Sequence, residues 1–141
     1  MSDQPTKMTG KVAFCATLSD NGAYGPFGQP KDVPFNKVIT NIGNCYNGST
    51  GVFTAPVDGV YYFSFFYHAG GNRPSGLQLV KNCQMIVQSG DHASKCDTAD
   101  NGGNVAVLQL NQNDRVYVQL PATCHVWGGG DSTTFSGFLL S

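Results

Sequence analysis

The aspartates, histidines and cysteines of this 141-residue sequence are the first residue types to consider for chemistry. All nine acids are aspartates, so the chain is poorly supplied with the paired carboxylates that most glycoside hydrolases use. The three histidines, His68, His92 and His125, stand outside GxSxG and similar nucleophile motifs. We therefore expect no catalytic residues and a protein that is not an enzyme.

An aspartate-rich segment, residues 90–103, is the best candidate for a metal site. Asp97 and Asp100, with Asp91 as a further candidate, offer hard oxygen ligands to which backbone carbonyls and water could add, as calcium prefers. Their spacing matches no calcium-loop motif. Solvated aspartates in turns are the alternative interpretation.

Polar and aromatic residues that could bind a ligand lie in four stretches between the predicted strands. These stretches are residues 20–32, 69–76, 90–103 and 122–132. The candidate ligand-binding residues, which could meet anionic or carbohydrate groups, are Arg73, His92, Lys95 and Trp127. An ordinary surface residue is the alternative for each of them.

The cysteines are widely spaced and contain no CxxC pair, so zinc or thioredoxin-type chemistry has no support. They are Cys15, Cys45, Cys83, Cys96 and Cys124. Disulfides are the expected use, although the sequence leaves the pairing open and buried free thiols are the alternative. Cys83 and Cys96 are the closest pair and could close a small loop.

The elements that must position these residues are β-strands. Gly and Pro number 18 and 7, charged residues make up 12% of the chain and aromatic residues 11%, which favours short strands joined by turns. No window shows a convincing helical stripe, so helix should be negligible. Strands are predicted at residues 11–18, 34–41, 50–55, 59–68, 76–82, 84–89, 104–110, 114–121 and 133–140.

Length and charge narrow the class of protein. We place a single globular domain at residues 11–141, and we interpret residues 1–10 as a flexible N-terminal segment or as residues added to the natural chain. The formal net charge is −1 with scattered Lys and Arg, which argues against binding to nucleic acid. The longest apolar run, residues 60–67, is too short to span a membrane as a helix.

That run also differs from an ordinary half-solvated strand, because both of its faces are apolar. The odd-numbered aromatic residues oppose Val60, Tyr62 and Phe66. One face of a sandwich strand packs into the core, so the other needs a second cover, for which a further copy of the molecule is the simplest. Tyr62 and Phe66 are the candidate interface residues, and a locally thick core is the alternative. Gly137 in mid-strand fits close approach by another group.

The span from Phe35 to Phe65 resembles the signature of the C1q domain family. Residues of the right type stand at the signature's spacing, namely Phe35, Asn41, Tyr46, Phe53, Gly59, Tyr61, Phe63 and Phe65. Residues 134–140, which include Phe135, Gly137 and Phe138, also agree. The resemblance covers roughly residues 11–140, and it is strongest to small secreted members, including the cerebellin-like proteins.

The resemblance implies an all-β, two-sheet, ten-stranded jelly roll like that of tumour necrosis factor ligands, assembled as a trimer. The signature residues, with Phe135, Gly137 and Phe138, would specify the fold and the core. Asn41 and Asn44 would satisfy backbone groups in an irregular connection. Some family trimers hold calcium in the region where Asp97 and Asp100 fall, so calcium is the one expected cofactor.

In function, the resemblance implies a secreted, homotrimeric recognition protein of innate immunity that binds bacterial surface molecules or immunoglobulin complexes. The alternative is a cerebellin-like or adipokine-like signalling ligand that docks on a receptor ectodomain. The fold does not separate the two. Export is compatible with the polar start of the chain only if a signal peptide has been trimmed, and the sequon Asn47-Gly48-Ser49 offers a glycosylation site at Asn47.

Overall fold

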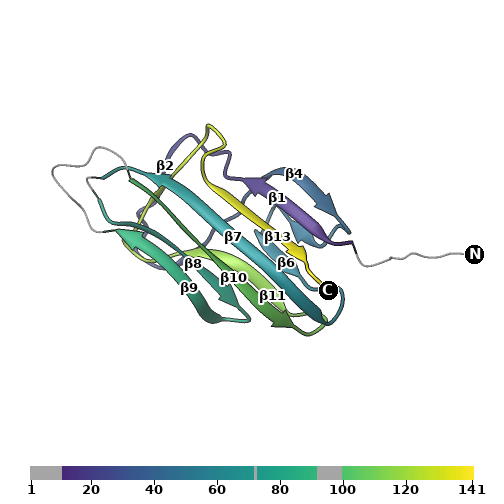
Figure 1. Cartoon of the computed structure of the whole chain (residues 1–141). Helices are drawn as coiled ribbons and strands as arrows, with labels where there is room; N and C mark the ends of the chain where they lie inside the picture. The colour runs from purple at the N-terminus through teal and green to yellow at the C-terminus, as the bar shows by residue number, and fades with distance from the viewer. Residues whose placement is uncertain (1–10, 72, 92–99) are drawn as a thin grey trace, which may run out of the picture.

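A computed structural model describes residues 11–71, 73–91 and 100–141, and these residues form β-strands without a helix (Figure 1). The all-β prediction is therefore confirmed. No helix in the described ranges could cross a membrane. The strands are β1 (Ala13–Thr17), β2 (Gly22–Tyr24), β3 (Lys31–Asp32), β4 (Lys37–Ile42), β5 (Tyr46–Asn47), β6 (Val52–Thr54), β7 (Gly59–Ala69), β8 (Ser75–Lys81), β9 (Gln84–Asp91), β10 (Asp100–Leu110), β11 (Arg115–Leu120), β12 (Val126–Gly128) and β13 (Thr134–Leu139).

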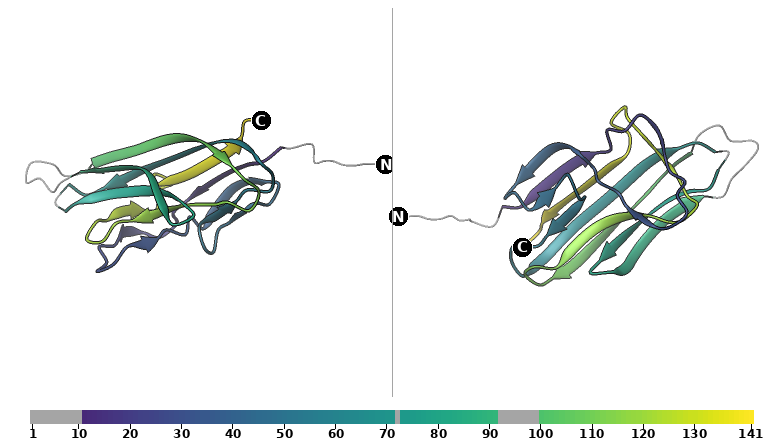
Figure 2. Two further views of the ribbon diagram at one scale, coloured as in Figure 1. Left: turned by 90° about the horizontal axis from the view of Figure 1, so that it is seen from below. Right: turned by 180° about the vertical axis from the view of Figure 1, so that it is seen from behind.

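The strands form two antiparallel sheets that pack face to face as a jelly roll (Figure 2). In sheet A, β7 lies between β10 and β13, β1 and β4 follow β13, and β12 pairs with both β7 and β2. Sheet B has the order β5-β6-β11-β8-β9, with β3 paired to β11. The start of β1 and the C-terminus lie at one end of the sandwich, and the end of β9 lies at the other (Figure 1).

All nine predicted strands are present. The structure adds β2, β3, β5 and β12, each of two or three residues, in stretches where the sequence predicts no strand. Such short strands carry too few residues for an alternating pattern to appear in the sequence. They account for much of the excess over the ten strands that the resemblance implies.

The inward face of β7 forms the centre of the core. Its odd-numbered aromatic residues from 61 to 67 are all buried. Phe53 of β6 faces two of them, with ring centroids 5.6 Å from Tyr61 and 5.4 Å from Phe63. Phe14 of β1 stacks on Phe53 at 5.2 Å. These edge and offset ring contacts add to the free energy gained by burying apolar area.

Asn41 and Tyr46 fix the connection between β4 and β6. The Asn41 side-chain amide donates to the Tyr46 carbonyl at 2.8 Å, and its oxygen accepts from the Tyr46 N–H at 3.3 Å. The buried Tyr46 hydroxyl donates to the carbonyl of Phe35, itself fully buried, at 2.8 Å. Burial raises the pKa of Tyr46. Asn44 adopts a left-handed conformation with φ 57°, and its backbone N–H donates to the Asn41 carbonyl at 3.3 Å.

Strand β10 begins earlier than predicted, because Gly102 and Gly103 belong to the strand and not to a turn. A Cβ atom at Gly102 would lie 2.5 Å from the Tyr67 ring, and one at Gly103 would overlap the Phe66 ring. The aromatic side chains of β7 therefore lie across β10 on both faces of the sheet. Glycine is required here for close approach of the rings.

Strand β13 corrects the expectation for Phe138 and confirms the core position expected of Gly137. Phe138 is 41% exposed and does not lie in the core, because it has the opposite parity to the buried Phe135. Gly137 faces the core, where a Cβ atom would lie 2.7 Å from ring atoms of both Phe14 and Phe63. The group that approaches Gly137 is therefore this chain's own aromatic core and not a second copy.

We predict that Gly137→Ala destabilises the fold by about 1–3 kcal/mol, since the added methyl group must displace two packed rings. The measurement is chemical unfolding followed by tryptophan fluorescence. Gly28→Ala is the matched control, because no atom lies within 4 Å of a Cβ atom there. Equal stability of the two variants would contradict this description of the core.

Candidate functional site

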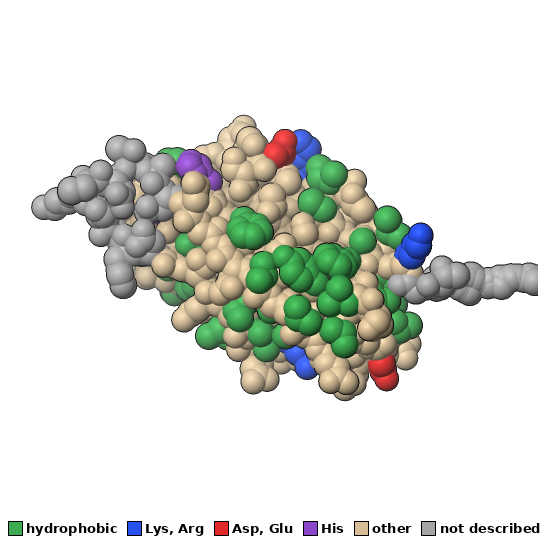
Figure 3. Space-filling view, viewed as in Figure 1, with side chains coloured by type: hydrophobic (Ala, Val, Ile, Leu, Met, Phe, Trp, Pro, Cys, Tyr) green, Lys and Arg blue, Asp and Glu red, His purple; other side chains and the backbone are tan. Residues whose placement is uncertain are grey.

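The outward face of sheet A carries a continuous apolar surface. We call it the outer apolar face and define it by Tyr62 and Phe66 of β7, Phe138 of β13, and Val105 and Val107 of β10. Phe66 is 49% and Val107 59% exposed. Figure 3 shows hydrophobic side chains gathered over these strands. A face of this kind favours interaction with another molecule over contact with water.

Strand register assembles this surface. Val107 pairs with Tyr62, and Tyr62 pairs with Phe138, so three side chains form a row across three strands. The Tyr62 and Phe138 rings lie 5.0 Å apart between centroids. In the next row Val105 and Ser136 both pair with Ser64. The small Ser64 side chain lowers the surface between Tyr62 and Phe66 along β7. The face thus has relief, which a complementary partner can fit.

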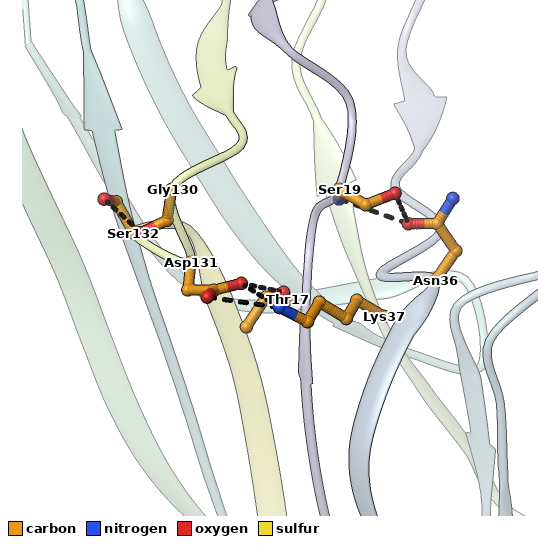
Figure 4. A network of polar contacts seen from close by, with 7 residues as sticks. All are labelled: Thr17, Ser19, Asn36, Lys37, Gly130, Asp131 and Ser132. Carbon is orange, nitrogen blue, oxygen red and sulfur yellow. Dashed lines mark hydrogen bonds and ion pairs between the residues drawn. The ribbon is translucent and has the colours of Figure 1, made fainter.

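Charge is confined to the margin of the outer apolar face. Lys37 of β4 and Asp131, just before β13, form an exposed ion pair at 3.0 Å, and the Thr17 hydroxyl donates to the same carboxylate at 3.2 Å (Figure 4). The Lys37 ammonium, followed by the Thr17 hydroxyl, lowers the pKa of Asp131. Each of the five residues that define the face is uncharged, so the face offers shape and apolar area without ionic specificity.

Trp127 and Arg73 are the candidate ligand residues that the structure describes. Trp127 of β12 is half-buried and packs edge-on against His68, with ring centroids 4.9 Å apart. His68 also approaches Asn101 of β10, with Nδ1 and Oδ1 separated by 2.5 Å. Arg73 is exposed in the β7–β8 connection and contributes to neither contact. His92 and Lys95 lie outside the described residues.

The predicted calcium ligands lie next to or within residues 92–99, which are outside the described residues. Asp91 ends β9 and Asp100 begins β10, so their backbones lie in the described part, while Asp97 lies outside it. Within the described ranges, no three His, Cys or Asp side chains form a metal-binding group. Asn47, the sequon residue, is exposed, and its side-chain oxygen accepts from the Ser49 N–H at 2.8 Å.

No disulfide joins the cysteines that the structure describes, and Cys96, which the sequence pairs most closely with Cys83, lies outside the described residues. Cys15, Cys45, Cys83 and Cys124 are free thiols on separate elements of the sandwich. Cys83 is exposed, while burial raises the pKa of Cys45 and Cys124. Asn82 and Cys83 are the two central residues of the β8–β9 hairpin, both with positive φ. Cys83 therefore occupies a tight turn.

Neither described histidine is placed for acid–base catalysis with a nucleophile. His125 is 2% exposed, and its ring nitrogens meet the Gly70 N–H at 3.0 Å and the Pro74 carbonyl at 2.8 Å. The ring ties the β7–β8 connection to the turn before β12, which is a structural task. Val105 and Val107 are not among the interface residues expected from the sequence, although the apolar run at residues 105–108 indicates a strand that needs cover on both faces.

Comparison with known sequences gives a family. The sequence model of the C1q domain matches residues 13–140. One chain of the human complement C1q subcomponent (Homo sapiens) is 35% identical over 136 residues, which are 95% of this chain and 52% of that relative. Collagen alpha-1(X) chain of Mus musculus is 31% identical over 95% of this chain and 20% of its own length. The chain thus spans about half, or less, of these curated relatives.

Comparison with solved structures gives the same fold. The globular domain of zebrafish complement 1qA protein superposes with a TM-score of 0.72 at 26% identity, over 93% of this chain and 98% of that one. Murine APRIL superposes with a TM-score of 0.71 at 11% identity, over 92% and 99% of the two chains. The second likeness concerns the fold alone, and it confirms the expected tumour-necrosis-factor-like jelly roll.

Proposed function

The chain belongs to the C1q domain family, and from this premise we propose that it is a secreted, non-enzymatic homotrimer that recognises microbial surface molecules or immune complexes. The observation that carries the proposal is the outer apolar face. Within the described residues, most exposed large hydrophobic side chains lie on sheet A or directly after it, from Val38 on β4 to Leu140 after β13.

A second and third copy of the chain are the occupants that best fit this face. The face is uncharged and contains relief, so it suits a partner with the same apolar character, as a symmetric homo-oligomer provides. It lies on β7, β10 and β13, and β7 contributes to both the core and the face. Trimerisation then covers Tyr62 and Phe66 and stabilises the strand on which the core depends.

Recognition of microbial surfaces is supported by the relationship to a complement protein at 35% identity. A trimer presents each weak binding site three times, and multivalency raises overall affinity on a repetitive surface by orders of magnitude. The described histidines bind backbone groups and Asn101, which supports recognition without catalysis.

Replacing Val107 by Asp should dissociate the trimer, because burying an unpaired carboxylate in the interface costs about 3 kcal/mol or more per chain. Sedimentation velocity at micromolar concentration is the measurement, with circular dichroism to verify that the variant is folded. Val57→Asp is the matched control, since Val57 is 44% exposed but lies in the turn before β7. A monomeric wild type, or a Val107→Asp trimer as stable as the control, would refute the proposed interface.

The function is tested on an array of lipopolysaccharide, lipoteichoic acid, aggregated immunoglobulin and receptor ectodomains. We expect the wild-type trimer to bind several microbial or immune-complex surfaces, and the Val107→Asp monomer to bind them about a hundredfold more weakly because avidity is lost. Saturable binding to one receptor ectodomain, without microbial binding, would support the cerebellin-like signalling alternative instead.

Calcium binding remains a proposal, with Asp97, Asp100 and Asp91 as the ligands. Asp91 is the last residue of β9 and Asp100 is the first residue of β10, so the two residues flank one connecting segment. Carboxylate oxygens are ligands that calcium prefers. Calorimetry should show calcium binding that Asp97→Ala and Asp100→Ala abolish and that Asp58→Ala, in the turn before β7, leaves unchanged. Equal heats for all variants would remove these residues as ligands.

A further inference from the structure

A groove opens on sheet B, away from the outer apolar face. It has a volume of about 350 Å³ and runs from the end of β9 across β8 to the turn after β11. Its lining is Pro74, Ser75, Gly76, Leu77, Gln78, Gln88, Ser89, Gly90, Pro121 and Cys124. None of these residues carries a charged side chain, so the groove suits a polar but neutral ligand.

Two glycines keep the groove open. Gly76 of β8 and Gly90 of β9 are paired across the two strands. A Cβ atom at Gly76 would lie 2.8 Å from the Ser89 carbonyl oxygen, and one at Gly90 would lie 3.0 Å from the Ser75 carbonyl oxygen. Side chains at these positions would crowd the backbone of the neighbouring strand. The paired glycines therefore leave bare backbone where other residue pairs would fill the space.

A row of amide side chains borders the glycine pair. Gln88, Gln78 and Gln119 stand in register across β9, β8 and β11. The Gln78 amide donates to the Gln88 side-chain oxygen at 3.2 Å, and Gln119 is tied to Asp32 at 3.1 Å. Among the described residues, nothing bonds to the Gln78 side-chain oxygen or to the Gln88 side-chain amide. One acceptor and two donors are thus available next to the groove.

We propose that this groove binds a neutral saccharide residue, whose adjacent hydroxyls pair with the Gln88 amide and the Gln78 oxygen. Hydroxyl groups both donate and accept, as the amide pair requires, whereas phosphate or carboxylate would meet no cation in the lining. An extended peptide could not add as a strand to β8, since β9 and β11 occupy both of its edges. The inference rests on the proposed function and names a ligand class for it.

The test uses the full chain and an array of neutral mannose, galactose and N-acetylglucosamine oligosaccharides, with calorimetry on the best binder. Gln88→Leu keeps the side-chain size and removes the amide, and it should weaken binding about tenfold through the loss of the hydrogen bond that the Gln88 amide makes to the ligand. Gln119→Leu is the matched control, because Gln119 stands in the same row but does not line the groove. Its affinity should be unchanged. In the wild type, saccharide addition should change the NMR chemical shifts of the Gly76 and Gly90 backbone amides.

The outcomes separate this proposal from the function on which it rests. Microbial binding by the wild type, with no neutral saccharide bound, would overturn the groove and leave the proposed function intact. Equal losses for Gln88→Leu and Gln119→Leu, or capture of extended peptides in place of saccharides, would also overturn it. Absence of both saccharide and microbial binding would reject the two proposals together.

Discussion

Side chains of an extended strand point alternately to opposite faces, and β7 carries large apolar residues on both of them. Its odd-numbered aromatics meet Phe53 and Phe14 in the core. Its even-numbered residues join Val107 and Phe138 in the outer apolar face. A one-residue shift in the register of β7 would exchange the two sets, so folding and assembly depend on the same pairing. The glycines of β10 are part of this arrangement, because they admit the rings of Phe66 and Tyr67.

The outward surfaces of the two sheets differ in polarity. Sheet A presents the outer apolar face, with the Lys37–Asp131 ion pair at its margin. Sheet B presents a row of glutamines beside a glycine pair and an uncharged polar groove. An apolar face suits permanent assembly, whereas a polar groove suits reversible binding from water. In a trimer formed through sheet A, the groove on sheet B would remain outside the interface and be repeated three times.

Much of the fold could be predicted from the sequence. Long strands show an alternation of side-chain character between their two faces, and the signature residues indicate the family. Alternation also located Tyr62 and Phe66 on the second face of β7. It misplaced Phe138, because aromatic character suggested the core while parity placed the residue outside. Alternation also placed the start of β10 too late, at residue 104, because the need for glycine at Gly103 depends on the Phe66 ring of a neighbouring strand. The groove of Gln78 and Gln88 could not be foreseen, because these residues become neighbours only through the register of β8 and β9.

The central claim, that the outer apolar face is covered by other copies of this chain, is tested most directly by hydroxyl-radical footprinting of the assembled protein. Phe66 is 49% exposed in the single chain and Phe27 is 37% exposed, so an isolated chain would label Phe66 at least as readily. The assembly predicts the reverse, with Phe66 strongly protected and Phe27 labelled. Labelling of Phe66 at or above the level of Phe27, at concentrations where the protein is most associated, would contradict it.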